Sequence, residues 1–596
     1  MQPTMEILAK INQSSKKNPN EVFTRLYRYL LREDIYFVAY KKLYANNGAG
    51  TKGIDNDTAD GFSYEYIHKI IAMLDENRYI PKPTRRTYIP KGNGKLRPIS
   101  VPTFTDKLVQ EVIRMILEAI YEPIFYDCSH GFRPKRGCHT ALDTIKKGWK
   151  GTKWFVEGDI KGCFNNIDHS RLIEIAGSKI KDKRFIDLIW KFLKAGYMEN
   201  WRYNRTHSGT PQGGIISPIL ANIYLHEFDK FVISLKGEYD KKADNYFNPD
   251  YKPLARQVEN IKKRIKNAIG EKRNMLISGY KEKRKKLIKT PCKSRTDKVL
   301  KYVRYADDFI IAVNGSKGDS EIVKAKLKTF LAENLKMELS EEKTYITHSS
   351  LPVLFLGYHI SARRTQQAKP DKNGVVKRTL NESIQLTVPF KEKIEKFLWN
   401  KKAVRVKGNA LFPAKRDYLL NLTDLEIVST YRAEMQGIFN FYNRAVDYHK
   451  LIYFNYLMEY GCLFTLARKH KCRLGKIITK YKDSHGRWGI PYETKGGKKR
   501  LYLPCLSDCK DNWLEDDFKN NTINHSFNTT SFEKRLQAKM CELCGVAGND
   551  IKFAIHHVNK VKNLKGKSNW EMVMIAKRRK TLVVCPKCHI HIHNGN

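Results

Sequence analysis

Residues 301–313, KYVRYADDFIIAV, join two apolar runs rich in β-branched and aromatic side chains through the tetrad Tyr-Ala-Asp-Asp at 305–308. The pattern predicts a β-hairpin that carries two adjacent carboxylates at its tip. Adjacent carboxylates repel each other, and desolvating them without a counter-charge costs free energy. We therefore expect Asp307 and Asp308 to serve chemistry, because they do not stabilise the core around them.

A pair of Mg²⁺ ions would supply the missing counter-charge. Phosphoryl transfer by two metal ions needs several carboxylates around ions that lie about 3.5–4 Å apart. The upstream segment WFVEGDIKGCFNNIDH offers a third carboxylate, because Asp159 ends an apolar-leaning strand and a Gly turn follows it. A solvated turn is the usual explanation for an Asp-Asp pair alone. The flanking strands and the second strand-ending Asp instead favour a metal site built from Asp159, Asp307 and Asp308.

The composition restricts the partners of the chain. Its 596 residues are too many for one ordinary core, so three or more domains are expected. It contains 110 Lys and Arg residues against 62 Asp and Glu residues, a formal net charge of +48. This surplus predicts a polyanionic partner, with nucleic acid favoured over a membrane surface. No apolar run is long enough to span a bilayer and no signal-peptide core follows Met1, so we expect a soluble intracellular protein.

The chain changes character along its length. From about residue 80 to residue 360, short β-like runs alternate with amphipathic helices. Residues 236–300 are dense in Lys and Arg, which predicts a helical insertion, and a solvated helical hairpin is favoured there over a specific site. Residues 391–480 are expected to be mostly helical, and residues 481–535 to form a small loop-rich module.

Seven motifs occur in the order and spacing of a polymerase core: KGNGKLRPISVP, HGFRPKRGCHTAL, FVEGDIKGCF, SGTPQGGIISPILANIYL, YADD, ELSEEKT and FLGY. With these motifs the chain resembles the reverse transcriptases and, within them, the group II intron-encoded proteins, along its whole length. The resemblance implies an α+β multidomain fold. Its implied parts are an N-terminal RNA-binding extension at 1–60, right-hand polymerase fingers and palm at 61–385 with the basic insertion at about 236–300, a helical thumb (domain X) at 386–480, a small DNA-binding module at 481–536, and a zinc-containing ββα-metal HNH domain at 537–596.

The resemblance implies roles for several palm residues. Asp159, Asp307 and Asp308 take the positions of the family's Mg²⁺-binding triad, with Asp308 acting either as a ligand or mainly through its charge. Phe164 matches the steric gate, an aromatic ring that collides with a 2′-hydroxyl and so selects deoxynucleotides, with an ordinary core Phe as the alternative. Lys343, in SEEKT, stands where the family often has a lysine near the leaving phosphate.

Three further residues match the family's nucleotide-binding positions. Lys91 and Arg97 match the fingers residues that hold the incoming dNTP triphosphate, whereas without the family both would be interpreted as solvated charges. Gln212, in TPQGG, matches the residue that packs under the nucleotide. Gly213 and Gly214 would let the backbone approach closely.

The segment STYRAEMQGIFNFYNRA is the most recognisable part of domain X, whose function in the family is maturase activity. A maturase binds its own intron RNA and stabilises the fold that splices, so no catalytic protein residue is expected there. Arg432 beside several aromatic rings suits folded RNA. The alternative is that most of these rings are thumb core: Tyr431, Phe439, Phe441 and Tyr442.

The C-terminal cysteines form two C-x-x-C pairs: Cys541, Cys544, Cys585 and Cys588. Their spacing predicts a tetrahedral Zn²⁺ site. A disulfide pair is the alternative, although the scattered cysteines elsewhere suit a reducing compartment. Cys505 and Cys509 have weaker spacing and no second half, so they are expected to be structural.

The segments IHHVN and CHIHIH lie between and after these cysteines and resemble an HNH nuclease. The resemblance implies that His557 is the general base for water, since an imidazole titrates near neutral pH. It also implies three ligands of one catalytic divalent ion: His556, His589 and His593.

The helical spacing and one departure from the family pattern qualify this assignment. His589 and His593 are four residues apart and share a helix face, whereas His591 falls on the opposite face and is left out. The family's middle Asn is replaced by Thr581 in TLVVC. Asn559 or Asn569 would substitute for it, or the role would be dispensable.

The resemblance as a whole implies an RNA-directed DNA polymerase that is also a maturase for splicing and a site-specific DNA endonuclease in intron retrohoming by target-primed reverse transcription. The implied partners are the intron RNA, in a ribonucleoprotein with the lariat, target double-stranded DNA and dNTPs, with a homodimer left open and no membrane. The implied cofactors are two Mg²⁺ ions in the polymerase, one divalent ion in the HNH domain and structural Zn²⁺. The expected location is the cytoplasm, at a bacterial nucleoid, with an organelle as the alternative.

Two other classes compete with this interpretation. A non-enzymatic RNA-binding splicing factor would show decayed Asp residues or lack the tail, and neither is seen in the sequence. A reverse transcriptase of another system, such as a retron, is disfavoured by the presence of domain X together with the HNH tail.

Overall fold

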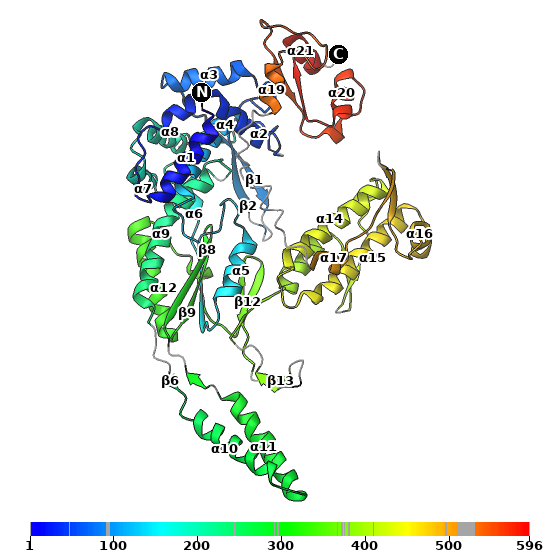
Figure 1. Ribbon diagram of the computed structural model, residues 1–596. Helices are drawn as coiled ribbons and strands as arrows, with labels where there is room; N and C mark the ends of the chain where they lie inside the picture. Colours follow the sequence, from blue (N-terminus) through cyan, green and yellow to red (C-terminus); the bar gives the residue numbers. More distant parts are fainter. Residues whose placement is uncertain are drawn as a thin grey trace.

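The computed structural model describes residues 2–46, 48–90, 94, 96–211, 213–241, 246–290, 292–294, 297–365, 368–370, 374, 376–378, 382–408, 410–494, 497–510 and 531–594. The molecule is elongated, with both chain ends at one extremity and a helical hairpin at the other (Figure 1). No helix within these ranges is long and apolar enough to cross a membrane.

The N-terminal part is a layer of helices around the buried helix α4 (Phe104–Tyr121). This helix begins after Thr103, whose hydroxyl accepts a hydrogen bond from the Asp106 N–H, and its residues are buried on nearly all sides. The other helices of the layer are α1 (Thr4–Lys17), η1 (Tyr27–Leu31), α2 (Glu33–Leu43), α3 (Tyr64–Asp75), α7 (His169–Lys179) and α8 (Lys183–Lys194).

A small sheet extends from this helical layer, with strand order β2-β1-β4-β5. Its long hairpin pairs β1 and β2 in antiparallel fashion, and β4 joins β1 in parallel. The strands are β1 (Thr84–Pro90), β2 (Leu96–Val101), β4 (Tyr197–Glu199) and β5 (Arg202–Asn204).

The central sheet is antiparallel throughout, with strand order β10-β3-β9-β8. Side chains alternate between its two faces, so that Val156 and Ile311 enter one hydrophobic cluster while Phe155 and Ile310 enter another. Helices α9 and α12 cover the first face and α5 the second (Figure 1). The elements are α5 (Cys138–Gly148), β3 (Trp154–Asp159), α6 (Cys163–Asn166), α9 (Ser217–Tyr239), β8 (Val299–Tyr305), β9 (Asp308–Asn314), α12 (Lys317–Leu335), η2 (Glu341–Lys343) and β10 (Ile346–His348).

The basic insertion is a pair of helices that projects from the central sheet (Figure 1). Lys241 and Lys298 exchange two backbone hydrogen bonds, of 2.9 and 3.1 Å, so the chain leaves and returns at one point. Neither α10 nor α11 contains a buried residue over its length. The elements are β6 (Tyr246–Phe247), α10 (Tyr251–Lys266), α11 (Glu271–Lys289), β7 (Lys293–Ser294), β13 (Ala368–Pro370) and β14 (Val376–Arg378).

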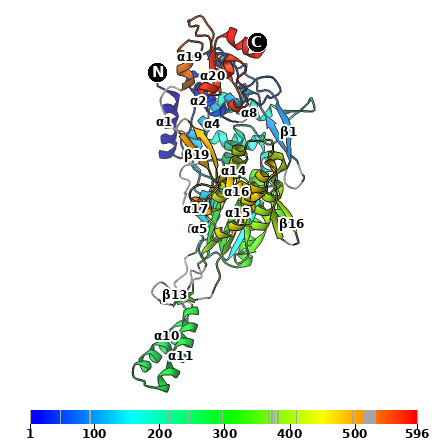
Figure 2. The same ribbon diagram turned by 90° about the vertical axis from the view of Figure 1, so that its right-hand side faces the viewer.

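A second body of helices lies beside the sheet and faces the viewer in Figure 2. Arg444 joins it to α5 through a 3.0 Å ion pair with Asp143. A three-stranded sheet beside α5 precedes this body and consists of β11 (Val353–Phe355), β12 (Tyr358–Ala362) and β15 (Ile384–Thr387) (Figure 1). The elements of the second body are η3 (Phe390–Glu395), α13 (Lys396–Asn400), β16 (Val404–Lys407), β17 (Ala410–Pro413), η4 (Asp417–Leu419), α14 (Asp424–Tyr442), η5 (Tyr448–Lys450), α15 (Leu451–Lys469), α16 (Leu474–Tyr481), β18 (Ile490–Thr494), β19 (Gly497–Leu501) and α17 (Leu506–Lys510).

The C-terminal module is an antiparallel pair of strands with a helix in the connection between them and a second helix after them, and it packs on the N-terminal layer. Phe532 meets the rings of Tyr40 and Tyr44, and Ile555 pairs with Phe62 as an isolated antiparallel bridge. The N-terminal layer and the C-terminal module therefore lie side by side (Figures 1 and 2). The elements are α19 (Ser531–Gln537), β20 (Ala554–His557), η6 (Val561–Asn563), α20 (Asn569–Lys577), β21 (Thr581–Val584) and α21 (Pro586–Asn594).

Candidate active sites and metal centres

Three carboxylates meet at one edge of the central sheet. Asp159 and Asp308 lie directly opposite each other on β3 and β9, and Asp307 belongs to the two-residue turn between Tyr305 and Asp308. The Nζ of Lys343 lies 2.5 Å from Asp159 Oδ2. The three carboxylates are less tightly grouped than the four C-terminal cysteines, or than Asp60 with three C-terminal histidines. In each of those two groups all the ligand atoms lie within 4.8 Å of one another.

The electrostatics of this edge favour a cation. Loss of hydration, together with repulsion from Asp307 and Asp159, raises the pKa of Asp308 to about 7, although its side chain still reaches solvent. Burial first and Asp159 next raise the pKa of Asp307, while Lys343 and Arg97 act in the opposite direction. The local positive charge therefore does not neutralise the three carboxylates. Oxygen ligands of this kind are those that Mg²⁺ prefers.

A buried network that no sequence pattern indicated supports the turn that carries Asp307. Arg304 is fully buried, and its guanidinium donates to both carboxylate oxygens of Asp229, at 2.8 and 2.6 Å. The same guanidinium donates to the carbonyl of Ala306 at 3.0 Å. The remaining contacts of this network go to Asn222, Ser129 and, through Asp229, to Tyr302. The network fixes the turn that carries Asp307.

Close packing of Gly131 against the backbone of Ala306 also restricts the conformation of this turn. Ala306 has a φ of 56°, a left-handed conformation that costs free energy for a residue with a Cβ. A Cβ added to Gly131 would lie 2.3 Å from the Ala306 nitrogen, so only glycine fits there. The amide of Asn222 donates to the Gly131 carbonyl at 2.8 Å and joins this contact to the Arg304 network.

Two of the four nucleotide candidates lie within the described residues. Arg97 is exposed on β2, and its charge acts on Asp307. Phe164 is half-buried at the start of α6 and meets the ring of Phe132 edge-on, with the centroids 6.0 Å apart. Lys91 and Gln212 lie outside the described residues.

The glycines after Gln212 allow a close backbone approach. Gly213 has a φ of 111°, and a Cβ there would lie 2.4 Å from the carbonyl oxygen of Ser100 on β2. A Cβ on Gly214 would lie 2.7 Å from Ser217 Oγ. The segment therefore contacts the β1–β2 hairpin through its backbone.

The aromatic residues proposed for RNA contact are mostly core. Tyr431, Phe439 and Tyr442 are buried, and Phe441 is half-buried against Tyr358. Arg432 is half-buried and donates to the Tyr502 carbonyl, so its role here is structural.

A different set of rings is exposed on α15. They recur every three or four residues along one helix face, and their ring centroids lie 4.8–6.5 Å from one another in succession. Helical spacing in YFNYLMEYGCLF was the signal that could have found them. The rings belong to Tyr453, Tyr456, Tyr460 and Phe464.

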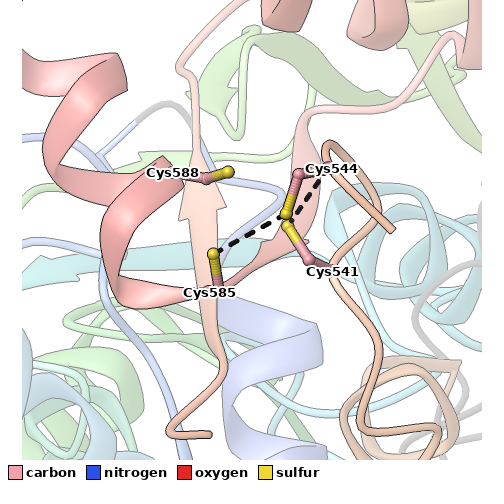
Figure 3. Close-up of side chains that lie close together, drawn as sticks. All are labelled: Cys541, Cys544, Cys585 and Cys588. Atoms are coloured by element: carbon pink, nitrogen blue, oxygen red, sulfur yellow. Dashed lines mark hydrogen bonds between the residues drawn. The ribbon is translucent and has the colours of Figure 1, made fainter. Parts of the chain in front are cut away.

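The four C-terminal thiols converge from two chain segments (Figure 3). The Sγ atoms of Cys544 and Cys585 are 3.9 Å apart. A Zn–S distance of about 2.3 Å gives a tetrahedron with edges of about 3.8 Å, so the spacing fits Zn²⁺. Cys505 and Cys509 lie elsewhere, beside the helices of the second body, and the Arg487 guanidinium donates to Cys505.

Three predicted histidines form the other compact cluster, together with Asp60. The Nε2 atoms of His589 and His593 lie 3.1 and 2.7 Å from Asp60 Oδ2, and His556 Nδ1 lies 3.0 Å from Oδ1. His591 is exposed. No motif or spacing indicated Asp60, which lies 529 residues from His589 in the chain.

Comparison with known proteins identifies the family. A family model for reverse transcriptase (RNA-dependent DNA polymerase) matches residues 81–240 and 281–360, one for type II intron maturase matches 381–532, and one for AI2M/AI1M-like HNH endonuclease matches 541–589. The chain is 56% identical to the group II intron-encoded protein LtrA of Lactococcus lactis, over 99% of both chains. The chain belongs to the group II intron-encoded proteins. It is also 34% identical to a 91 kDa protein in the cob intron of Schizosaccharomyces pombe, over 98% of this chain and 72% of that one. A putative COX1/OXI3 intron 2 protein of Saccharomyces cerevisiae is 30% identical, over 99% of this chain and 68% of its own.

This group II intron-encoded protein therefore combines reverse transcriptase, maturase and HNH endonuclease regions in one chain. The multifunctional enzyme expected from the motifs is confirmed at this level.

In its HNH region the candidate base lies on β20, beside the N-terminal layer. His557 is nearly buried, and its Nε2 lies 3.2 Å from the Tyr44 carbonyl oxygen. Burial lowers the pKa of His557, while the bond to Tyr44 opposes the shift. Thr581 stands opposite His557 in the hairpin, and its hydroxyl accepts a hydrogen bond from Arg535 at 3.0 Å.

The two Asn residues named as substitutes for the family's middle Asn lie in different surroundings. Asn559 packs against Gly50, where an added Cβ would lie 2.1 Å from its side chain. Asn569 is exposed at the start of α20.

Proposed function

We propose that Asp159, Asp307 and Asp308 hold two Mg²⁺ ions and form the polymerase active site. When bound, such ions activate the primer 3′-hydroxyl and neutralise charge on the triphosphate. The three carboxylates position both reactants at the sheet edge. The register that sets Asp159 beside Asp308, with Asp307 in the turn, is the observation that carries this proposal. Lys343 lies close enough to Asp159 to reach the leaving phosphate of a nucleotide at this edge.

The β1–β2 hairpin supplies the nucleotide side of the site. Arg97 would hold the triphosphate in bidentate fashion and Lys91 as a point charge. Gln212 would pack beneath the base, and Phe164 would exclude the 2′-hydroxyl. The half-buried ring of Phe164 supports this role, because a fully buried core Phe could not meet a substrate.

RNA binding by the helical body accounts for the maturase function. The net charge of +48 supports a polyanionic partner, and we assign the intron RNA, with its lariat, to that partner. The exposed rings of α15 provide stacking surfaces that suit unpaired bases. The N-terminal residues 1–60 and the basic helices α10 and α11 would add phosphate contacts.

The C-terminal module would cut DNA. We assign one Zn²⁺ to the four cysteines as a structural ion, and one divalent ion to His556, His589 and His593 for cleavage. When bound, the divalent ion stabilises charge on the scissile phosphate. His557 would take a proton from the attacking water. Residues 481–536 would contact target double-stranded DNA. A fold of the ββα-metal type is supported by the order β20, β21, α21.

These activities combine in retrohoming. The protein binds the intron RNA, the RNA reverse-splices into one DNA strand, the HNH module cuts the other, and the polymerase copies the intron from the freed 3′-end. We place this in the bacterial cytoplasm, at the nucleoid, and leave dimerisation to measurement.

Co-expression with the intron that flanks the gene tests the proposal. Splicing should require the protein, and the purified ribonucleoprotein should extend an annealed DNA primer with dNTPs. Splicing that proceeds equally without the protein would contradict the maturase assignment. Failure of primer extension by a correctly folded protein would contradict the polymerase assignment.

A further inference from the structure

Asp60 lies in the loop before α3 but makes its contacts in the HNH module. Its carboxylate lies within 2.7–3.1 Å of ring nitrogens of three histidines, and the backbone N–H of His557 donates to Oδ1 at 2.7 Å. The side chain of Asp60 is 18% exposed. A carboxylate from the opposite end of the chain therefore occupies the centre of the candidate nuclease site.

The geometry suits a shared metal ion better than ordinary hydrogen bonds. Each of the four residues offers a ligand atom, and these atoms all lie within 4.8 Å of one another. His556 is 5% exposed, yet neither of its ring nitrogens has a hydrogen-bond partner, although Nδ1 lies 3.0 Å from Asp60 Oδ1. A short distance between two acceptor atoms that share no hydrogen bond is the arrangement expected of two ligands of one ion, because the lone pairs of both atoms point at the ion and not at each other. An unpaired buried imidazole otherwise costs free energy.

The donor set is also complete. Three imidazoles and one carboxylate satisfy a four-coordinate divalent ion, whereas a catalytic site keeps one position open for water or substrate. The position that Asp60 takes is the position that a scissile phosphate would need.

The surrounding loop closes the site as well. Gly61 N–H donates to the Ile555 carbonyl and Ile555 N–H to the Phe62 carbonyl, both at 2.9 Å. The Tyr44 carbonyl covers the His557 ring, which is 9% exposed. In this arrangement the base cannot reach a phosphodiester of duplex DNA.

We propose that Asp60 is the fourth protein ligand of the HNH divalent ion and holds the nuclease closed until a DNA phosphate displaces it. The proposal rests on the proposed function of the three histidines. Opening exchanges one anionic oxygen ligand for another at the same ion, so the ligand charge at the ion is conserved, while the displaced Asp60 carboxylate turns toward solvent. Binding of duplex DNA to the module then displaces Asp60 and places a DNA phosphate in the vacated ligand position.

The test compares Asp60→Asn with Asp55→Asn in the full-length, zinc-loaded protein. Asp55 is a matched control, because it lies on the same loop and pairs with Lys82 at 2.8 Å, away from the histidines. Ni²⁺ affinity is measured by calorimetry, and nicking of duplex DNA is measured with Mg²⁺ in the absence of intron RNA. Zinc content and primer extension verify that both variants are folded.

Asp60→Asn should weaken Ni²⁺ binding by about 10-fold or more, the scale at which even partners of metal ligands act. The same change should raise basal nicking several-fold, whereas Asp55→Asn should leave both unchanged. Wild-type Ni²⁺ affinity in Asp60→Asn would overturn the ligand assignment. If Asp60→Asn weakened Ni²⁺ binding but also reduced nicking, the proposal that Asp60 holds the nuclease closed would be wrong, since Asp60 would then be needed for cleavage.

A third variant separates this inference from the function on which it rests. His593→Ala should weaken Ni²⁺ binding at least as much as Asp60→Asn. If His593→Ala leaves the affinity unchanged, the proposed histidine site is wrong. If only Asp60→Asn leaves it unchanged, the histidine site stands and the Asp60 proposal fails.

Discussion

The guanidinium of Arg304 donates a 3.0 Å hydrogen bond to the carbonyl oxygen of Ala306, two residues further along the chain. The contact ties the turn that carries Asp307 to the buried carboxylate of Asp229. The position of Asp307, a proposed metal ligand, thus depends on an ion pair with no exposed surface.

Arg304→Lys should lower both the stability of the polymerase region and its rate of nucleotide incorporation. A lysine cannot make the forked contact with Asp229 and reach Ala306 as well, and breaking a buried pair costs about 3–5 kcal/mol. We expect a lower unfolding temperature and a loss of nucleotide incorporation larger than the loss of folded protein. Arg416→Lys is the control, because Arg416 is equally buried but pairs with Glu434 in the helical body. Equal loss of incorporation per folded molecule in both variants would contradict a positioning role for Arg304.

Asp307→Ala should separate polymerase from maturase function. The change removes a proposed metal ligand and leaves the exposed rings of α15 in place. We expect cDNA synthesis to be lost and protein-dependent splicing to persist, measured on the same preparation. A folded variant with an equal loss of splicing would show that the two functions are not independent.

Phe164→Ala should admit ribonucleotides. The ring is proposed to act by exclusion, so its removal should lower discrimination against ribonucleotides more than it lowers dNTP incorporation. Phe164→Tyr keeps the ring and should keep the discrimination. Single-turnover incorporation of matched dNTP and NTP pairs provides the measurement. An unchanged preference in the Ala variant would leave Phe164 with a packing role only.

In the metal-free protein, Asp308 should contribute stability that is lost as pH rises from about 4 to 7. Folding raises the pKa of Asp308 from 3.8 to about 7, so in this window the folded chain holds a proton that the unfolded chain releases. Stability from this group is complete below the unfolded pKa and lost as pH rises through the folded pKa. Thermal unfolding at several pH values, with and without Mg²⁺, measures the effect. Asp308→Asn should flatten the profile, and an identical profile in that variant would contradict the assignment.

Cys585→Ser should unfold the C-terminal module, because a small module gains much of its folding free energy from a structural metal. Bound zinc and bottom-strand cleavage should be lost together, while extension of an annealed primer persists. His557→Ala should retain zinc and reduce cleavage by about 10²-fold or more, the usual scale for a lost base. Nicking by His557→Ala at the wild-type rate would leave the four cysteines as a structural element only.

Local patterns explain which features the sequence could predict. Apolar, β-rich runs on both sides of YADD predict a hairpin, and C-x-x-C spacing predicts a thiol cluster, because the residues of each signal lie within a few positions of one another. The Arg304–Asp229 pair joins a strand to a helix 75 residues away, and a single Arg within a strand pattern gives no sign of its partner. Asp60 meets its histidines only because two distant modules pack together.

The second body of helices shows a feature that composition did not predict correctly, namely which aromatic rings are exposed. Arg432 and its neighbouring rings have the composition of an RNA surface, yet helix orientation turns Tyr431 and Phe439 into the core. Composition does not fix which face of a helix is covered. The packing of α14 and α15 against each other and their neighbours leaves Tyr453 and Tyr456, on α15, exposed to solvent.

The bridge between Lys241 and Lys298 separates the basic hairpin from the polymerase core. The palm requires only that these two residues meet, and the helices α10 and α11 beyond them bury no residue. Insertions, deletions and charge changes in that hairpin leave the polymerase core without a cavity or a broken strand. Folding of the polymerase core therefore places almost no constraint on the length or the surface charge of this projection, which can be shortened, extended or recharged as a separate attachment.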